Sequence, residues 1–169
     1  MTGGAPIVLV DTNVWLDNYL ADRPHAAQSR AFIVQARNAG VQLVYPVHCL
    51  NDVFVLIQAH LKRAAREKGA LAESDVAAIR EIAWACIENM REFATAVGAD
   101  ESDAWKACKY RRLTNDLEDN FVLAAAERAT VDFLVTNDKR LLHKSTVNAY
   151  TPEDATLVLS LSQPICNMC

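Results

Sequence analysis

The stretch IVLVDTN at residues 7–13 decides the predicted fold. Four aliphatic residues are followed at once by three polar ones, which is typical of a strand buried on both faces of a parallel sheet. The stretch FLVTND at residues 133–138 repeats this pattern. Open parallel sheets bind ligands at the carboxyl ends of their strands. If the two strands are neighbours, Asp11 and Asp138 meet at one edge of the sheet.

The rest of the chain alternates short apolar runs with amphipathic helical patterns. This alternation predicts the α/β class, with helices on both faces of a central parallel sheet in a three-layer α/β/α arrangement. Strands are expected over 7–10, 42–45, 133–135 and 146–150. From the spacing of apolar residues, helices are expected over 26–38, 47–67, 74–95, 102–113, 117–129 and 152–161.

The composition predicts a soluble, cytoplasmic protein with a single domain over 1–169. The chain has 169 residues, of which 51% are hydrophobic and 22% charged, as in an ordinary globular domain. No apolar run approaches the roughly 20 residues of a membrane span. The run that follows the N-terminus is shorter than a signal-peptide core of about 7–15 residues. A net charge of −4 argues against nucleic-acid binding through bulk positive charge, but not against a local basic strip.

The five cysteines fit a reducing compartment. Cys49, Cys86 and Cys108 occur singly and are expected to be small buried residues. Cys166 and Cys169 form a C-x-x-C pair, but no second ligand pair stands at a spacing that suits zinc. We therefore expect a flexible tail over 162–169.

Each acid near the predicted edge also has a structural interpretation. An Asp before Thr-Asn at a strand end often only caps the next helix, so capping and catalysis have equal weight for Asp11. Asp138 fits a turn before Lys139 equally well. Asp52 lies early in the helix expected over 47–67, and its neighbour Asn51 competes with it for the inward face.

The segment 116–119 brings three acids to the start of the helix expected over 117–129. Asp119 shares a face with apolar residues three, four and seven positions later. A carboxylate on a buried face is costly unless it is paired or binds a metal, which favours function for Asp119. Asn115 and Glu118 resemble a capping box, so for Glu118 a structural role is favoured. Asp116 also suits a helix N-terminus.

Several carboxylates in one place raise each other's pKa values unless a counter-charge is present. An oxygen-only set of ligands suits Mg²⁺ or Mn²⁺, and the four histidines show no metal-type spacing. A phosphatase of the haloacid-dehalogenase type is the competing enzyme class. It needs an Asp two residues after Asp11, where this chain has Asn13, so the sequence argues against it.

Three segments, in this order, resemble the PIN-domain family, which includes the VapC-type toxins of bacterial toxin–antitoxin pairs. They are VLVDTN at 8–13, DNFVLAAA at 119–126 and DFLVTND at 132–138. The resemblance extends from residue 7 to about residue 155. It implies a PIN-like fold and hydrolysis of RNA phosphodiester bonds with Mg²⁺ or Mn²⁺. It also implies an RNA substrate, an antitoxin protein as partner, and a homodimer.

The resemblance places the four acids of the family on Asp11, Asp52, Asp119 and Asp138. Of these, Asp11, Asp119 and Asp138 are the expected metal ligands. The second acid is usually Glu in the family, so Asp52 shortens that side chain by one methylene. This departure keeps open a non-catalytic PIN-like module that binds RNA or protein. The chain is also longer than the compact toxins, and a helical insertion around 63–95 is expected to account for the difference.

Other polar residues beside the acids are expected to support the site. Those expected to position water or ligands are Thr12, Asn13, Asp116, Thr136 and Asn137. Those expected to contact RNA phosphates are Lys109, Arg111, Arg112, Lys139 and Arg140. Solvated helix faces explain the basic residues equally well, whereas phosphate contacts would make RNA binding strongly salt-dependent. Trp105 and Tyr110 either stack on unpaired bases or pack into the core.

Overall fold

A five-stranded sheet, parallel throughout, forms the centre of the computed structural model, which describes residues 4–162. In spatial order the strands are β3 (Ala94–Val97), β2 (Gln42–Pro46), β1 (Ile7–Val10), β4 (Phe133–Val135) and β5 (Ala149–Tyr150). Val8 of β1 lies opposite Leu43 of β2 and Phe133 of β4. Strands β1 and β4 are neighbours, the condition on which the sequence argument depended, so their carboxyl ends lie at the same edge.

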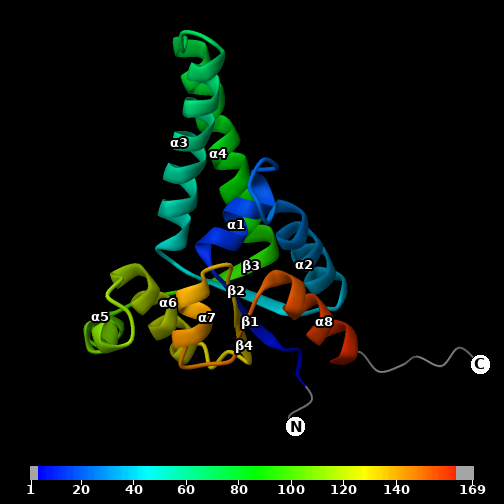
Figure 1. The fold of residues 1–169 in the computed structure, drawn as a ribbon, viewed down its shortest axis with the longest axis vertical. Coiled ribbons are helices and arrows are strands. Elements are labelled where there is room, and N and C mark those ends of the chain that lie inside the picture. Colours follow the sequence, from blue (N-terminus) through cyan, green and yellow to red (C-terminus); the bar gives the residue numbers. More distant parts are fainter. Residues whose placement is uncertain (1–3, 163–169) are drawn as a thin grey trace, which may run out of the picture.

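Helices cover both faces of this sheet (Figure 1). They are α1 (Thr12–Tyr19), α2 (Ala26–Asn38), α3 (Cys49–Lys68), α4 (Glu73–Phe93), α5 (Glu101–Lys109), α6 (Leu117–Arg128), α7 (Lys139–Lys144) and α8 (Pro152–Ser162), with a 3₁₀ turn, η1 (Tyr110–Arg112). The predicted three-layer α/β/α fold is therefore confirmed. No helix among the described residues is long and apolar enough to cross a membrane.

The central strand β1 divides its side chains between two cores. Val8 and Val10 pack with Trp15 on the face covered by α1, α2, α3, α4 and α8. Leu9 packs with Leu123 on the face covered by α6, η1 and α7. All five side chains are fully buried, and burial of each is worth roughly 1.5–3 kcal/mol. The two cores hold β1 from both sides, which fixes the position of the residues that follow it.

The pair α3 and α4 extends well beyond the sheet (Figure 1). The range 63–95, where a helical insertion is expected, covers the outer end of α3 and all of α4. Gly69 ends α3 with φ 156°, a backbone conformation that L side chains rarely adopt. The predicted helix over 74–95 was wrong at its end, because residues 94–97 form the edge strand β3.

Two further helices and the chain end differ from the prediction. Helices α1 and α7 begin directly after the polar strand ends at Asp11 and Asp138, and neither was among the expected helices, although Asp11 was considered as a helix cap. The strand predicted over 146–150 is shorter, since β5 covers only Ala149–Tyr150. The tail predicted over 162–169 begins at the last residue of α8, and 163–169 lie outside the described residues.

Candidate functional site

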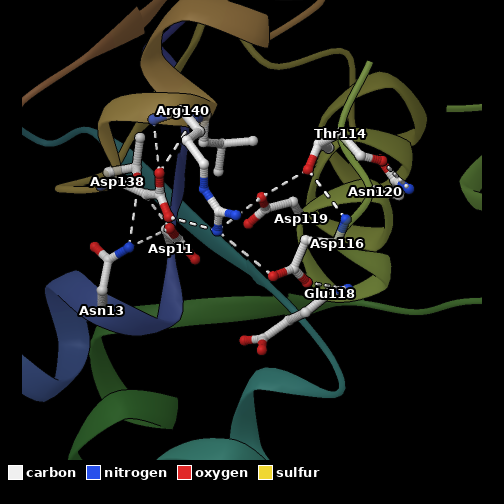
Figure 2. Close-up of polar contacts among 11 residues, drawn as sticks. Asp11, Asn13, Thr114, Asp116, Glu118, Asp119, Asn120, Asp138 and Arg140 are labelled. Atoms are coloured by element: carbon white, nitrogen blue, oxygen red, sulfur yellow. Dashed lines mark hydrogen bonds and ion pairs between the residues drawn. The ribbon is translucent and has the colours of Figure 1, made fainter. Parts of the chain in front are cut away.

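An acidic pocket of about 190 Å³ opens at the carboxyl ends of β1 and β4 (Figure 2). Its carboxylates are those of Asp11, Asp116, Glu118, Asp119 and Asp138. They come from three segments that are far apart in the sequence, and Thr12, Asn13 and Arg140 lie among them. Four larger pockets contain at most one carboxylate each, so the acidic pocket is the candidate site.

Asp11 ends β1 and is almost completely buried, with 6% of its surface exposed. It occupies the N-cap position of α1, but its side chain makes no capping hydrogen bond. Its Oδ2 instead accepts hydrogen bonds from Thr136 Oγ1 at 2.6 Å and from Asn13 Nδ2 at 2.5 Å. Of the two interpretations left open by the sequence, the structure therefore rules out simple capping.

The surroundings of Asp11 oppose its negative charge. Burial is the largest effect and raises the pKa of Asp11 to about 7, against 3.8 in an exposed side chain. The hydrogen bond from Thr136 lowers the pKa, while the charges of Glu118 and Asp119 raise it further. A cation that enters the pocket would therefore stabilise the ionised form of Asp11 and lower its pKa.

Hydrogen bonds between the ends of β1 and β4 hold Asp11 in place. Asn13 donates from Nδ2 to Thr136 Oγ1 at 3.1 Å and accepts through Oδ1 from the backbone N–H of Asn137 at 2.9 Å. Thr136 is fully buried, and its hydroxyl also accepts from the backbone N–H of Asp138 at 3.0 Å. Asn13 and Thr136 thus both hydrogen-bond to Asp11.

The side chain of Asn137 does not reach the acids. Its Nδ2 donates to Asp17 Oδ2 at 2.7 Å and to Ser29 Oγ at 3.3 Å. Asp17 is buried and also pairs with Arg23, so this amide joins β4 to α1 and α2. Only the backbone of Asn137 contacts the hydrogen-bond network around Asp11, through its N–H.

Asp138 both caps α7 and lines the acidic pocket. Its Oδ1 accepts from the backbone N–H groups of Arg140 at 2.7 Å and Leu141 at 3.3 Å. Burial alone would raise the pKa of Asp138, but hydrogen bonds from Arg140 and Leu141 outweigh it and lower the pKa below its usual value. Asp138 therefore stays ionised and fixed in position at neutral pH.

The N-terminus of α6 supplies the remaining acids. Asp116 is the N-cap, and its Oδ1 accepts from the backbone N–H of Glu118 at 3.1 Å. The capping box expected from Asn115 and Glu118 was wrong, because Asp116 takes the capping position and the Glu118 side chain lines the pocket. Asp119 accepts from Thr114 Oγ1 at 3.1 Å, and burial followed by the charge of Asp116 raises its pKa.

Glu118 lines the acidic pocket, whereas Asp52, the residue expected to be the second acid, does not. Asp52 is half-buried on α3, but α3 reaches the pocket through Leu56, one turn later. Burial raises the pKa of Glu118 most, and the charge of Asp52 is the next cause, so the two acids are close. Asn51 lines a separate groove with residues of α4. Of Asn51 and Asp52, which competed for the face of α3 directed toward the site, Asp52 is therefore the one that lies near the acidic pocket. Sequence patterns missed Glu118 because its place at a helix start suggested a cap.

Arg140, expected to contact RNA, lies among the acids instead. Its Nη2 is 3.3 Å from Asp138 Oδ2, 3.5 Å from Asp116 Oδ2 and 3.8 Å from Asp119 Oδ2 (Figure 2). The three carboxylates raise the pKa of Arg140, with Asp138 as the largest cause. No sequence pattern indicated this contact, since α7 itself was not predicted.

The other basic residues expected to bind RNA lie outside the pocket. Lys109 is exposed, with its Nζ 5.1 Å from the ring centre of Trp105, which is 63% exposed. Arg111 and Arg112 are exposed on η1, and Lys139 is exposed at the start of α7. Tyr110 is buried, so core packing is its role. Trp105 remains available at the surface.

The donor chemistry of the acidic pocket suits a hard divalent cation, because its ionisable groups are carboxylates apart from one guanidinium. Within residues 4–162, however, no three His, Cys, Asp or Glu side chains lie close enough together, as they stand, to enclose an ion. The guanidinium of Arg140 connects three of the carboxylates instead. The ligands are thus of the right kind, and part of their negative charge is already met by an internal cation.

Comparisons with known proteins agree with this architecture. No curated protein sequence matches the chain. Among solved structures, the fold is similar to a chain in the crystal structure of VapBC2 from Rickettsia felis bound to a DNA fragment from their promoter. That likeness covers 86% of this chain and 98% of the other, with a TM-score of 0.56 and 10% sequence identity. A family model described as PIN domain matches residues 7–140, which include β1, α6 and β4 with all the acids of the pocket. The chain therefore belongs to the PIN-domain family.

Proposed function

We propose that this protein is a divalent-metal-dependent endoribonuclease that hydrolyses RNA phosphodiester bonds. PIN domains are generally nucleases and typically use divalent metals, which supports a hydrolase. The observation that carries the proposal is the acidic pocket itself. Five carboxylates from three segments line one opening at the carboxyl ends of β1 and β4.

The proposed ligands of the cation are Asp11, Asp119 and Asp138, with Glu118 and Asp116 beside them. When bound, Mg²⁺ or Mn²⁺ would polarise the scissile phosphate and lower the pKa of the attacking water. The surrounding residues keep the acids in place. Thr136 and Asn13 hold Asp11, and α7 holds Asp138 through backbone N–H groups. These hydrogen bonds limit how far the acids must move when a metal ion binds.

The exposed cations on η1 and at the start of α7 are proposed to bind the RNA backbone. Arg111 and Arg112 lie shortly before the acids of α6 in the chain, and Lys139 directly follows Asp138. The exposed ring of Trp105, next to Lys109, offers a surface on which an unpaired base stacks. These features favour single-stranded RNA, and binding through them should weaken steeply as salt increases.

A role as the toxin of a toxin–antitoxin pair is proposed as well. The matched solved structure is of a VapBC2 complex with promoter DNA, and it shares this fold. Large apolar side chains on the α3–α4 pair, Val55, Ile82 and Trp84, are about half exposed. Apolar side chains left uncovered on this protruding helix pair offer surface that a bound protein would bury, which supports an antitoxin or a second copy of the chain as partner. A small neighbouring gene for a DNA-binding protein would support this role.

We expect the protein to cleave a generic single-stranded RNA only when a divalent metal is present. End-labelled RNA is incubated with metal-free protein, and Mg²⁺ or Mn²⁺ is added in steps, with EDTA in the control. Cleavage should rise with metal and disappear with EDTA. Undiminished cleavage in EDTA would contradict metal dependence. No cleavage with either metal, on several RNAs, would favour the non-catalytic binding module instead.

A further inference from the structure

We infer that Arg140 is an internal counter-cation that competes with the divalent metal for the acidic pocket, and so sets how tightly the metal binds. The inference rests on the proposed function, because it assumes that the acids hold a metal. A single nitrogen, Nη2, lies within 3.3–3.8 Å of oxygens from Asp138, Asp116 and Asp119. Two of these acids, Asp119 and Asp138, are proposed metal ligands. A bound cation and the seated guanidinium therefore need the same carboxylate oxygens.

The contacts of Arg140 are loose enough to be given up. Strong hydrogen bonds between a guanidinium and a carboxylate measure about 2.7–2.9 Å, whereas the three contacts of Nη2 measure 3.3, 3.5 and 3.8 Å. The side chain of Arg140 is 64% exposed, and exposed ion pairs contribute little individually. The guanidinium can thus turn into solvent at small cost.

The acids remain in position when the guanidinium leaves. The other oxygen of Asp138, Oδ1, is held by the backbone N–H groups of Arg140 and Leu141. Asp119 keeps its hydrogen bond from Thr114, and Asp116 keeps the one from the Glu118 backbone. Without a cation, their like charges repel one another. A divalent ion carries two charges at one point, so the carboxylates attract it more strongly than they attract the guanidinium, and it displaces Arg140. A monovalent ion is attracted less strongly and competes less well.

The test is the affinity of the metal-free protein for Mn²⁺, measured by titration calorimetry without RNA. Arg140→Gln should bind Mn²⁺ roughly tenfold more tightly than the native chain, because three weak ion pairs no longer compete. Lys144→Gln is the matched control, since it removes another exposed charge of α7 that does not line the pocket. Its affinity should stay within about twofold of native. Arg140→Lys, which keeps the charge, should lie closer to native than Arg140→Gln does.

The possible outcomes separate the two proposals. Equal or weaker Mn²⁺ binding by Arg140→Gln would overturn the inference and leave the proposed function standing. An equal increase in Mn²⁺ affinity for Lys144→Gln would also overturn it, because the loss of any positive charge from α7 would then explain the result. Failure of every form to bind Mn²⁺ would remove the metal site and the proposed function together. If Arg140→Gln does not fold, as judged by thermal unfolding, Arg140→Met takes its place, and equal or weaker Mn²⁺ binding by Arg140→Met than by the native chain would overturn the inference.

Discussion

Asp11→Asn is expected to lower the rate of metal-dependent RNA cleavage by at least about a hundredfold. The amide keeps nearly the same size and can still accept the hydrogen bonds from Thr136 and Asn13. It carries no charge, so the pocket loses the carboxylate that stands at the end of its central strand. The effect should therefore appear in catalysis and metal affinity while the fold is retained. Initial cleavage rates at saturating Mg²⁺ measure it.

The matched control for this substitution is Asp22→Asn. Asp22 is 68% exposed, pairs only with His60 among the contacts of the described residues, and does not line the acidic pocket. Its replacement makes the same chemical change away from the proposed site, and cleavage should stay within about twofold of native. Equal cleavage by native protein and Asp11→Asn would rule out the proposed role of Asp11. An equal loss in both variants would point to a general effect of charge.

The same substitution is expected to stabilise the metal-free protein at neutral and higher pH. Burial raises the pKa of Asp11 to about 7 in the folded state, above 3.8 for an exposed side chain. Between these values the unfolded chain has an ionised Asp11 and the folded chain a protonated one, so native stability falls as pH rises. Above pH 7 the folded protein carries the full free-energy cost of a buried, ionised Asp11. Removing this charge should therefore raise the free energy of unfolding by roughly 4 kcal/mol.

Urea unfolding in EDTA at pH 4, 5.5 and 8 measures this difference. Native protein and Asp11→Asn should have nearly equal free energies of unfolding at pH 4 and should diverge as pH rises. Comparing the two proteins at each pH cancels the contributions of other acids, such as Asp138, whose lowered pKa acts in the opposite direction. Parallel pH profiles would show that Asp11 carries no such penalty.

The central strands and both strand-end motifs were predictable from sequence. The apolar runs at 7–10 and 133–135 are typical of strands buried on both faces of a sheet, and polar residues directly after them mark the edge where ligands bind. Strand β3 was missed because its residues, ATAV, continue a long helical pattern and only partly need burial at the sheet edge. Helices α1 and α7 were missed because each starts without a linker, and α7 has only six residues.

The candidate site was less predictable than the sheet, for reasons specific to each side chain. Asp11, Asn13 and Thr136 could be placed because each lies within three residues of the end of a buried strand. Glu118 and Arg140 could not, because long side chains at helix starts point in directions that only the packing of α6 and α7 decides. From the local sequence, Glu118 resembles a helix-capping residue and Arg140 resembles a solvent-exposed cation. Only the fold brings them into contact range of distant acids.

The location of Mn²⁺ tests the central claim, that these acids hold the metal used for cleavage, most directly. Crystals of the metal-free protein are soaked in Mn²⁺ at a concentration that supports cleavage in solution, and anomalous scattering locates the ion. A peak in the acidic pocket, with Asp11, Asp119 or Asp138 as ligands, is the predicted result. An empty pocket under these conditions, or a peak only elsewhere on the protein, would contradict the account.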